Sequence, residues 1–253
     1  MEIPEYEKSY KIPVYDIGFN GQLSPFALFN YLQDIASEHA VLLNFGKDDL
    51  LRDNHFWVLS RIAAQVKIWP GWEDTVVVKT WPRGTDKLFA LRDYEVKYPD
   101  GRTVALASSS WLVVDMTTRR VQRPDSHLTS FNPGEAVRSS LGRNAIKIEP
   151  VAEDFVISPD LRVQISDLDI NLHVNNVIYL KWITDSYDLG FRTNHFPASV
   201  EINYLAESRL NDEIVIKTSA DKNNCNLYNH SVVRSVDNTE LCRMQLLWEN
   251  CPQ

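Results

Sequence analysis

The sequence predicts an α+β fold of two related halves in tandem, each a long helix wrapped by an antiparallel sheet. The segment DLDINLHVNNVIYLKW at 167–182 has a weaker copy, FNGQLSPFALFNYLQD at 19–34, at an offset of 151 residues. Further on, DTVVVKT at 74–80 matches DEIVIKT at 212–218, at an offset of 138. In both copies a helical pattern comes first and strand patterns follow, which indicates one repeated unit.

The N-terminal half is predicted over residues 1–125. Ser24 and Pro25 open a helix over 24–44, because serine is a good N-cap and proline suits the first turn. Four strand patterns follow, and Pro99-Asp100-Gly101 marks a hairpin turn between the last two. These patterns are FWVLSRIAAQVKI, TVVVKTW, KLFALRDYEVKY and TVALASSSWLVVD.

The C-terminal half is predicted over 161–253, after a connecting segment at 126–160. Asn175 or Asn176 caps a second helix, whose apolar spacing continues until Gly190 ends it. Strands are expected near 198–205, 213–220, 225–236 and 240–249.

The polar segment before the second helix is the strongest indication of chemistry. Asp169, Asn171 and His173 occupy every second position, so an extended backbone would project them to one side at a helix N-terminus. The matching positions of the N-terminal copy are Gly18, Asn20 and Gln22. The pattern therefore favours one active and one degenerate half. The alternative for His173 alone is a loop histidine that caps backbone groups, and Asp167 is a second carboxylate to consider.

Composition narrows the function classes. The net charge of -8, from 26 basic and 34 acidic residues, argues against nucleic acid as the main partner. No stretch approaches the ~18 apolar residues of a membrane span, and the start lacks a signal-peptide pattern, so a cytoplasmic protein without stable membrane insertion is expected. Cys225, Cys242 and Cys251 form no CxxC pair, and we expect them to be reduced and structural.

Three elements of the sequence resemble a known family. DLDINLHVNNVIYLKWI, INYLAES followed by NDEI, and ASSSWLVVDMTTRRVQRP at 107–124 are similar to the acyl-acyl carrier protein thioesterases of plants and bacteria, over roughly residues 10–249. The resemblance implies a double hotdog fold and hydrolysis of fatty acyl thioesters on acyl carrier protein. It also implies the catalytic set Asp169, Asn171, His173 and Glu207, and an acyl-chain pocket contributed mostly by the N-terminal half.

The implied residues suit that reaction. Thioester hydrolysis needs a positioned water, a base and donors for the developing oxyanion, and it requires no metal and no cofactor. His173 and Glu207 are base candidates, Asn171 can hold the water or the carbonyl, and Asp169 can orient a neighbour. Backbone N–H groups at the start of the helix near Asn175 offer oxyanion donors.

The sequence departs from the family at one position. Many plant members carry cysteine directly after the glutamate, where this chain has Ser208. If Ser208 faces His173, the serine can act as a nucleophile and form an acyl-enzyme. If Glu207 faces His173, water attacks the thioester directly. We expect Glu207, because the family element keeps the acid while serine is a poor nucleophile unless it is activated.

Two other functions stay open at this stage. An acyl-CoA thioesterase would use the same residues on a different thiol carrier, and a hotdog protein that binds acyl thioesters without hydrolysis would be a sensor or scaffold. Acyl carrier protein is the expected partner, with Arg119, Arg120 and Arg123 as a candidate docking patch that also fits a solvated linker. The sequence predicts neither acyl chain length nor oligomeric state.

Overall fold

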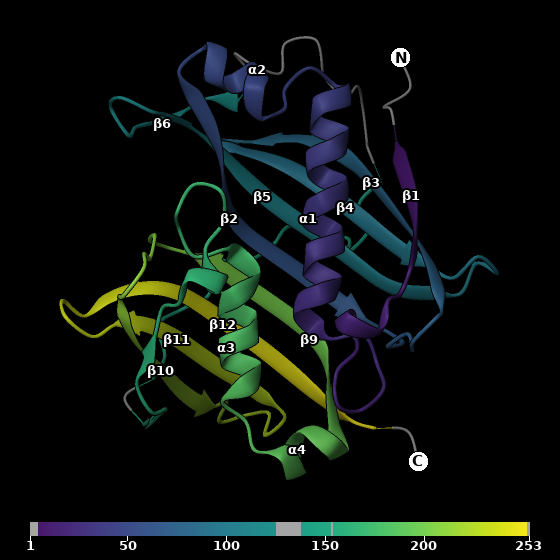
Figure 1. The fold of residues 1–253 in the computed structure, drawn as a ribbon, viewed down its shortest axis with the longest axis vertical. Coiled ribbons are helices and arrows are strands. Elements are labelled where there is room, and N and C mark those ends of the chain that lie inside the picture. The colour runs from purple at the N-terminus through teal and green to yellow at the C-terminus, as the bar shows by residue number, and fades with distance from the viewer. Residues whose placement is uncertain (1–4, 125–137, 153, 252–253) are drawn as a thin grey trace. The chain divides into compact units, whose positions relative to one another are not determined.

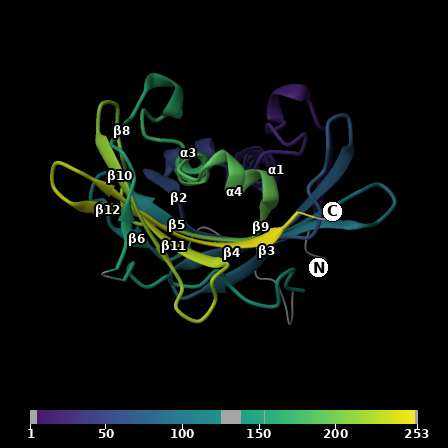
Figure 2. The same cartoon turned by 90° about the horizontal axis from the view of Figure 1, so that it is seen from below.

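The fold was analysed in a computed structural model that describes residues 5–124, 138–152 and 154–251. The chain divides into two compact units, Met1–Ala145 and Ile146–Gln253. Each unit has its own helix on its own antiparallel sheet (Figure 1). Seen from below, the helix of each unit lies on the concave face of that sheet (Figure 2). No helix among the described residues is long and apolar enough to cross a membrane.

The N-terminal sheet has the strand order β1-β3-β4-β5-β2, and β6 pairs with β5. Every pairing in it is antiparallel. The two helices of this half are α1 (Pro25–Leu42) and α2 (Lys47–Arg52). Its strands are β1 (Tyr6–Lys11), β2 (His55–Val66), β3 (Thr75–Asp86), β4 (Phe89–Lys97), β5 (Thr103–Asp115) and β6 (Val121–Gln122).

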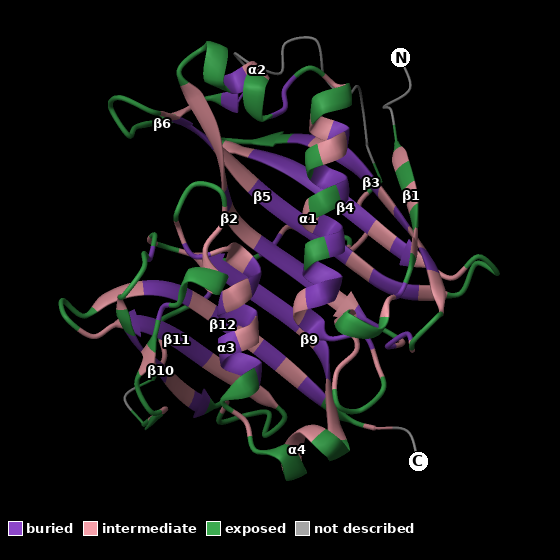
Figure 3. Ribbon diagram, viewed as in Figure 1, coloured by how far each residue is buried: buried purple, intermediate pink, exposed green. Residues whose placement is uncertain are grey.

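The long helix α1 forms where the sequence predicts it. Pro25 occupies its first turn, and Leu28, Leu32 and Ile35 place one apolar stripe against the sheet. The buried face of α1 and the buried centres of the strands are visible in Figure 3. The hairpin at Pro99-Asp100-Gly101 is also confirmed: the Gly101 amide donates to the Tyr98 carbonyl at 2.9 Å, and Gly101 has φ of 91°.

The C-terminal sheet has the order β9-β12-β11-β10-β7, and β8 also pairs with β10. Its helices are α3 (Asn176–Asp185) and α4 (Leu189–Asn194). Its strands are β7 (Val156–Ile157), β8 (Leu161–Arg162), β9 (His195–Tyr204), β10 (Glu213–Ala220), β11 (Leu227–Arg234) and β12 (Thr239–Asn250).

The predicted end of the second helix was wrong. α3 stops at Asp185, and Gly190 lies inside the separate short helix α4. The hydroxyl of Ser186 donates to the Ile183 carbonyl at 2.7 Å, which satisfies one of the last carbonyls of α3. Asp188 then caps α4 by accepting from the Phe191 amide at 2.9 Å. Ser186 at the end of α3 and Asp188 at the start of α4 therefore divide the apolar pattern into two helices.

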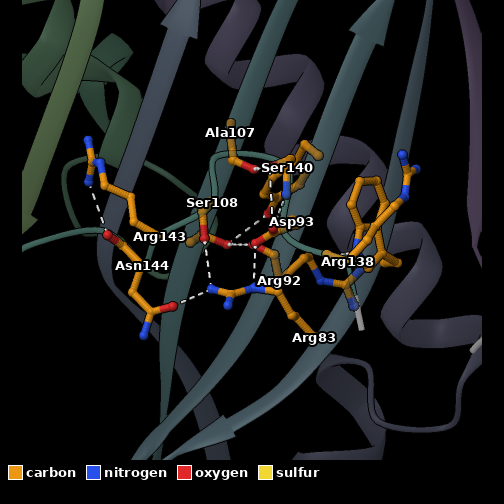
Figure 4. Close-up of polar contacts among 12 residues, drawn as sticks. Arg83, Arg92, Asp93, Ala107, Ser108, Arg138, Ser140, Arg143 and Asn144 are labelled. Carbon is orange, nitrogen blue, oxygen red and sulfur yellow. Dashed lines mark hydrogen bonds and ion pairs between the residues drawn. The ribbon is translucent and has the colours of Figure 1, made fainter. Parts of the chain in front are cut away.

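The connecting segment predicted at 126–160 is not a simple linker where it is described; residues 126–137 and 153 lie outside the described part. Figure 4 shows residues of this segment from Arg138 to Asn144 beside the N-terminal sheet. The amide and hydroxyl of Ser140 donate to the buried Asp93 carboxylate at 2.7 and 3.2 Å, and Arg83 holds the same carboxylate at 3.0 Å. Side chains alternate along β4, and Arg92 contacts His39 of α1, so Asp93 faces away from the helix.

The rest of that segment binds the C-terminal sheet in a similar way. The amide of Ile146 donates to Glu201 at 2.6 Å, and the amide of Ile148 donates to Asn203 at 2.8 Å. Further along, β7 pairs with β10. Side chains of the sheets accept from the amides of Ser140, Ile146 and Ile148, and β7 is only two residues long, so the segment carries no strand pattern.

Candidate functional site

The segment that carries Asp169, Asn171 and His173 is a tight turn. The Asp169 amide donates to the His173 carbonyl at 2.8 Å, and the Leu172 amide donates back to the Asp169 carbonyl at 3.0 Å. Leu172 closes the turn with φ of 61°, in the left-handed region. The extended conformation predicted from alternate polar residues was therefore wrong, and Ile170 is 80% exposed as a result.

The turn nevertheless connects the three polar residues, because the Asp169 carboxylate contacts both Asn171 and His173. Its Oδ1 accepts from the amides of Asn171 at 2.7 Å and His173 at 3.3 Å. Its Oδ2 lies 3.4 Å from the Asn171 side-chain amide nitrogen. One acid thus fixes both the backbone and the side chain of its neighbours.

Glu207 faces His173. The amide of Val174 donates to the Ser208 carbonyl at 2.9 Å, and His173 forms an isolated antiparallel bridge with Arg209. This backbone register brings Glu207 Oε2 to 3.4 Å from His173 Nε2. The side chains are 25% exposed for His173 and 38% for Glu207, so solvent reaches the pair.

Ser208 points elsewhere. It is fully buried, and its hydroxyl donates to Asp212 Oδ2 at 2.9 Å. Glu207 and Ser208 belong to an irregular segment after β9. Their side chains still diverge, and the acid is the one beside His173.

The start of α3 adds backbone donors next to the turn. Asn175 is the N-cap: its side chain accepts from the Val177 amide at 3.3 Å, and its own amide donates to the Asp167 carbonyl at 2.9 Å. Asp167 accepts from the Gln164 amide at 2.8 Å, in keeping with a turn role. The amide of Asn176 has no acceptor within the described residues.

The matching turn of the N-terminal half has the same backbone hydrogen bonds but different side chains. The Gly18 amide donates to the Gln22 carbonyl at 2.8 Å, the Gly21 amide donates to Gly18, and Gly21 has φ of 76°, where the other copy has Leu172. The residue 138 positions before Glu207 is Trp69, which is 8% exposed. Glycine, glutamine and tryptophan thus stand where the C-terminal half has aspartate, histidine and glutamate.

The arginines considered for docking lie after β5. The Arg119 amide donates to the Asp115 carbonyl at 2.9 Å, and Arg120 accepts from the Asp115 amide at 3.0 Å, which closes a turn before β6. The Arg119 guanidinium lies 5.1 Å from the centre of the Phe56 ring. All three side chains are exposed; Arg119 and Arg120 lie in the turn between β5 and β6, whereas Arg123 follows β6.

Sequence reasoning missed two charged residues behind the site, Asp212 and Arg234. Arg234 Nη1 lies 3.3 Å from Asp212 Oδ2 and 3.4 Å from the Glu207 carbonyl oxygen. Asp212 could have been found, because the second repeated motif has an aspartate at this position in both copies. Nothing in the sequence pairs Arg234 with it.

Comparison with known families matches both halves. The model of the acyl-ACP thioesterase N-terminal domain covers residues 4–130, and that of the C-terminal domain covers 152–250. A chloroplastic palmitoyl-acyl carrier protein thioesterase of Arabidopsis thaliana is 29% identical over 252 residues, 95% of this chain and 60% of its own length. Oleoyl-acyl carrier protein thioesterase 2 of the same plant is 27% identical, over 87% of this chain and 64% of its own. The chain thus spans about 60% of the length of these curated relatives.

Solved structures match over nearly the whole chain. An acyl-ACP thioesterase from Bacteroides thetaiotaomicron superposes with a TM-score of 0.82 and 26% identity, covering 97% of this chain and 98% of its own. A 12:0-ACP thioesterase from Umbellularia californica shares the fold, with a TM-score of 0.85, 22% identity and coverage of 98% and 94%. The double hotdog architecture is therefore confirmed.

Proposed function

Since the chain belongs to the acyl-acyl carrier protein thioesterase family, we propose that it hydrolyses fatty acyl thioesters on acyl carrier protein and releases free fatty acid. The observation that carries this proposal is the His173–Glu207 pair, 3.4 Å apart beside the turn that Asp169 holds. An imidazole next to a carboxylate at a partly exposed site is suited to taking a proton from water.

Water attack on the thioester carbonyl is the proposed chemical step. His173 or Glu207 acts as the base that takes the proton of the attacking water. The other member of the pair orients that base or stabilises the charge that the base acquires. The Asn171 side chain, held near Asp169, presents an amide to the water or to the carbonyl. Asp169 holds this turn in place and has no acceptor role toward substrate in the proposal.

The developing oxyanion needs donors that are already in place. The Asn176 amide stands at the first position of α3, where the helix dipole favours negative charge. We assign it as the oxyanion donor. The thiolate of the carrier's prosthetic arm is the leaving group, and collapse of the tetrahedral intermediate gives the fatty acid.

Ser208 has no nucleophilic role in this proposal. A serine nucleophile needs an adjacent base, whereas the Ser208 hydroxyl is buried and donates to Asp212. The proposed site comprises Asn171, His173 and Glu207, with Asp169 holding the turn, and all four lie in the C-terminal half. The N-terminal half, degenerate at Gly18, Gln22 and Trp69, is proposed to contribute to acyl-chain binding.

The test is analysis of the products from a mixed pool of acyl carrier protein thioesters, with the same acyl groups on CoA as a second arm. We expect free fatty acids from the carrier-bound pool, and a fall of about 10²-fold or more for His173→Ala, the usual effect of losing a general base. Gln22→Ala is the matched control, and it should keep wild-type turnover.

The outcomes separate the functions considered. Faster turnover on CoA would make the protein an acyl-CoA thioesterase, and no release from either pool would favour a binding protein without activity. The cytoplasmic location stays a prediction; the two plant relatives are chloroplastic.

A further inference from the structure

We infer that Asp212 and Arg234 are positioning residues that hold Glu207 opposite His173. The inference rests on the proposed function, because Glu207 is taken as part of the catalytic pair. Neither residue touches the reacting groups directly. Their role follows from three sets of contacts, all within the C-terminal half.

Asp212 ties down the two residues that follow Glu207. Its Oδ2 accepts from the Ser208 hydroxyl at 2.9 Å and from the Arg209 amide at 3.0 Å. Burial alone would raise the pKa of Asp212, but the bonds from Arg209, Ser208 and Arg234 outweigh it and hold that pKa below its ordinary value. The carboxylate is therefore ionised at neutral pH, when it accepts most strongly.

Arg234 fixes Glu207 itself. From the end of β11, its Nη1 reaches both Asp212 Oδ2 at 3.3 Å and the Glu207 carbonyl oxygen at 3.4 Å. The other side of its guanidinium is held by Asp237, through Nε at 3.1 Å and Nη2 at 2.9 Å. A guanidinium clamped in this way is a rigid support, because its fork leaves few alternative orientations.

The backbone on the opposite side completes the arrangement. Val174 donates to the Ser208 carbonyl, and His173 bridges Arg209. Glu207 therefore precedes a segment held by the His173 turn on one side and by Asp212 and Arg234 on the other. Release of either side would let the Glu207 carboxylate move away from Nε2.

The degenerate half shows which part of this support is special. Its Asp74 accepts from the Gly71 amide at 2.9 Å, as Asp212 does from Arg209, so the turn itself is common to both halves. There, however, Asp74 accepts its second bond from the neutral Tyr98 hydroxyl at 3.1 Å, and Pro70 stands where the other half has Ser208. The clamping arginine and the serine occur in the half that carries Glu207.

Steady-state kinetics of Asp212→Asn on carrier-bound substrate test the inference, with Asp74→Asn as the matched control. We expect kcat to fall about tenfold or more in Asp212→Asn, because a misplaced catalytic group costs on the order of 10- to 100-fold, while KM stays within about twofold. Asp74→Asn should lose similar stability but keep wild-type kcat. Arg234→Gln should resemble Asp212→Asn, and Arg234→Lys should recover part of kcat.

A crystal structure of Asp212→Asn gives a readout that does not depend on activity. The distance from His173 Nε2 to Glu207 Oε2, 3.4 Å here, should lengthen beyond ion-pair range. Wild-type kcat in a folded Asp212→Asn, an equal loss of kcat in Asp74→Asn, or an unchanged distance would overturn the inference. If Asp212→Asn does not fold, the same measurements on Arg234→Gln decide. Lack of hydrolysis by the wild type would instead refute the proposed function, and the distance would still test the positioning role.

Discussion

Two buried histidines, one in each half, should make the fold sensitive to mild acid. His230 is fully buried in β11, where its Nε2 lies 3.0 Å from the Tyr187 hydroxyl and its Nδ1 lies 2.9 Å from the Thr218 hydroxyl. Burial lowers the pKa of His230 to about 3. Burial and the nearby Arg92 charge lower the pKa of His39 to about 4. Both rings are therefore neutral in the folded state at pH 5.

The sign and size of the effect follow from linkage. In the unfolded chain a histidine titrates near pH 6.5. Below that pH the unfolded state therefore binds a proton at each of these histidines, whereas the folded state does not. Stability is therefore complete above pH 6.5 and falls as the pH is lowered toward the folded-state values. Between pH 7.5 and 5.0 each histidine costs about 2 kcal/mol of unfolding free energy. Most carboxylates stay ionised above pH 5 and contribute little in this window.

Urea unfolding at pH 7.5 and pH 5.0 measures the loss, and His230→Gln supplies the control. Glutamine can bond both hydroxyls but does not titrate, so this variant should lose about 2 kcal/mol less than the wild type across the window. His39→Gln should behave alike in the other half. Equal pH dependence in the wild type and in His230→Gln would refute the argument for His230.

The remaining predictions concern the site and the carrier. Glu207→Gln should lower kcat by about 10²-fold or more, whereas Ser208→Ala should cost only a few-fold, and steady-state kinetics on carrier-bound substrate measure both. Loss of activity in Ser208→Ala with survival in Glu207→Gln would reverse the assignment. Charge reversal at Arg120 should raise KM for carrier-bound substrate, more at low salt than at high, because carrier docking is expected to be electrostatic. An unchanged KM at low salt would remove this patch.

The repeat made much of the fold predictable from the sequence. Hydrogen bonds of the two turns correspond one for one: the Gly18 and Asp169 amides donate to residues 22 and 173, and the Leu23 and Val174 amides donate to residues 70 and 208. The strand patterns at 103–115 and 213–220 match β5 and β10, whereas β3 continues through Pro82 and Gly84 to Asp86, beyond the predicted TVVVKTW. Repetition in sequence thus translated directly into repetition of backbone contacts.

What the sequence hid depends on tertiary contacts. Alternation of polar residues predicted an extended segment, but a leucine in the left-handed region folds it into a turn, and no periodicity reports a positive φ at Leu172. The short strands β7 and β8 are too brief to leave a pattern. The approach of Arg234 to Glu207 joins residues 27 positions apart through a side chain, which only the assembled sheet reveals.

The sequence by itself left open whether Glu207 or Ser208 faces His173. The family resemblance favoured the acid, and the geometry places that acid 3.4 Å from His173 while Ser208 bonds Asp212. The catalytic roles of these residues stay predictions. Their positions define which experiment separates water attack from an acyl-enzyme.

That experiment is a single-turnover reaction with radiolabelled acyl carrier protein thioester, stopped by acid on the millisecond-to-second scale. If water attacks directly beside His173 and Glu207, label will pass from the carrier to free fatty acid and none will be found covalently on the protein at any time. A protein-bound acyl group that forms and decays at the rate of fatty acid release, and that is lost in Ser208→Ala, would contradict the account.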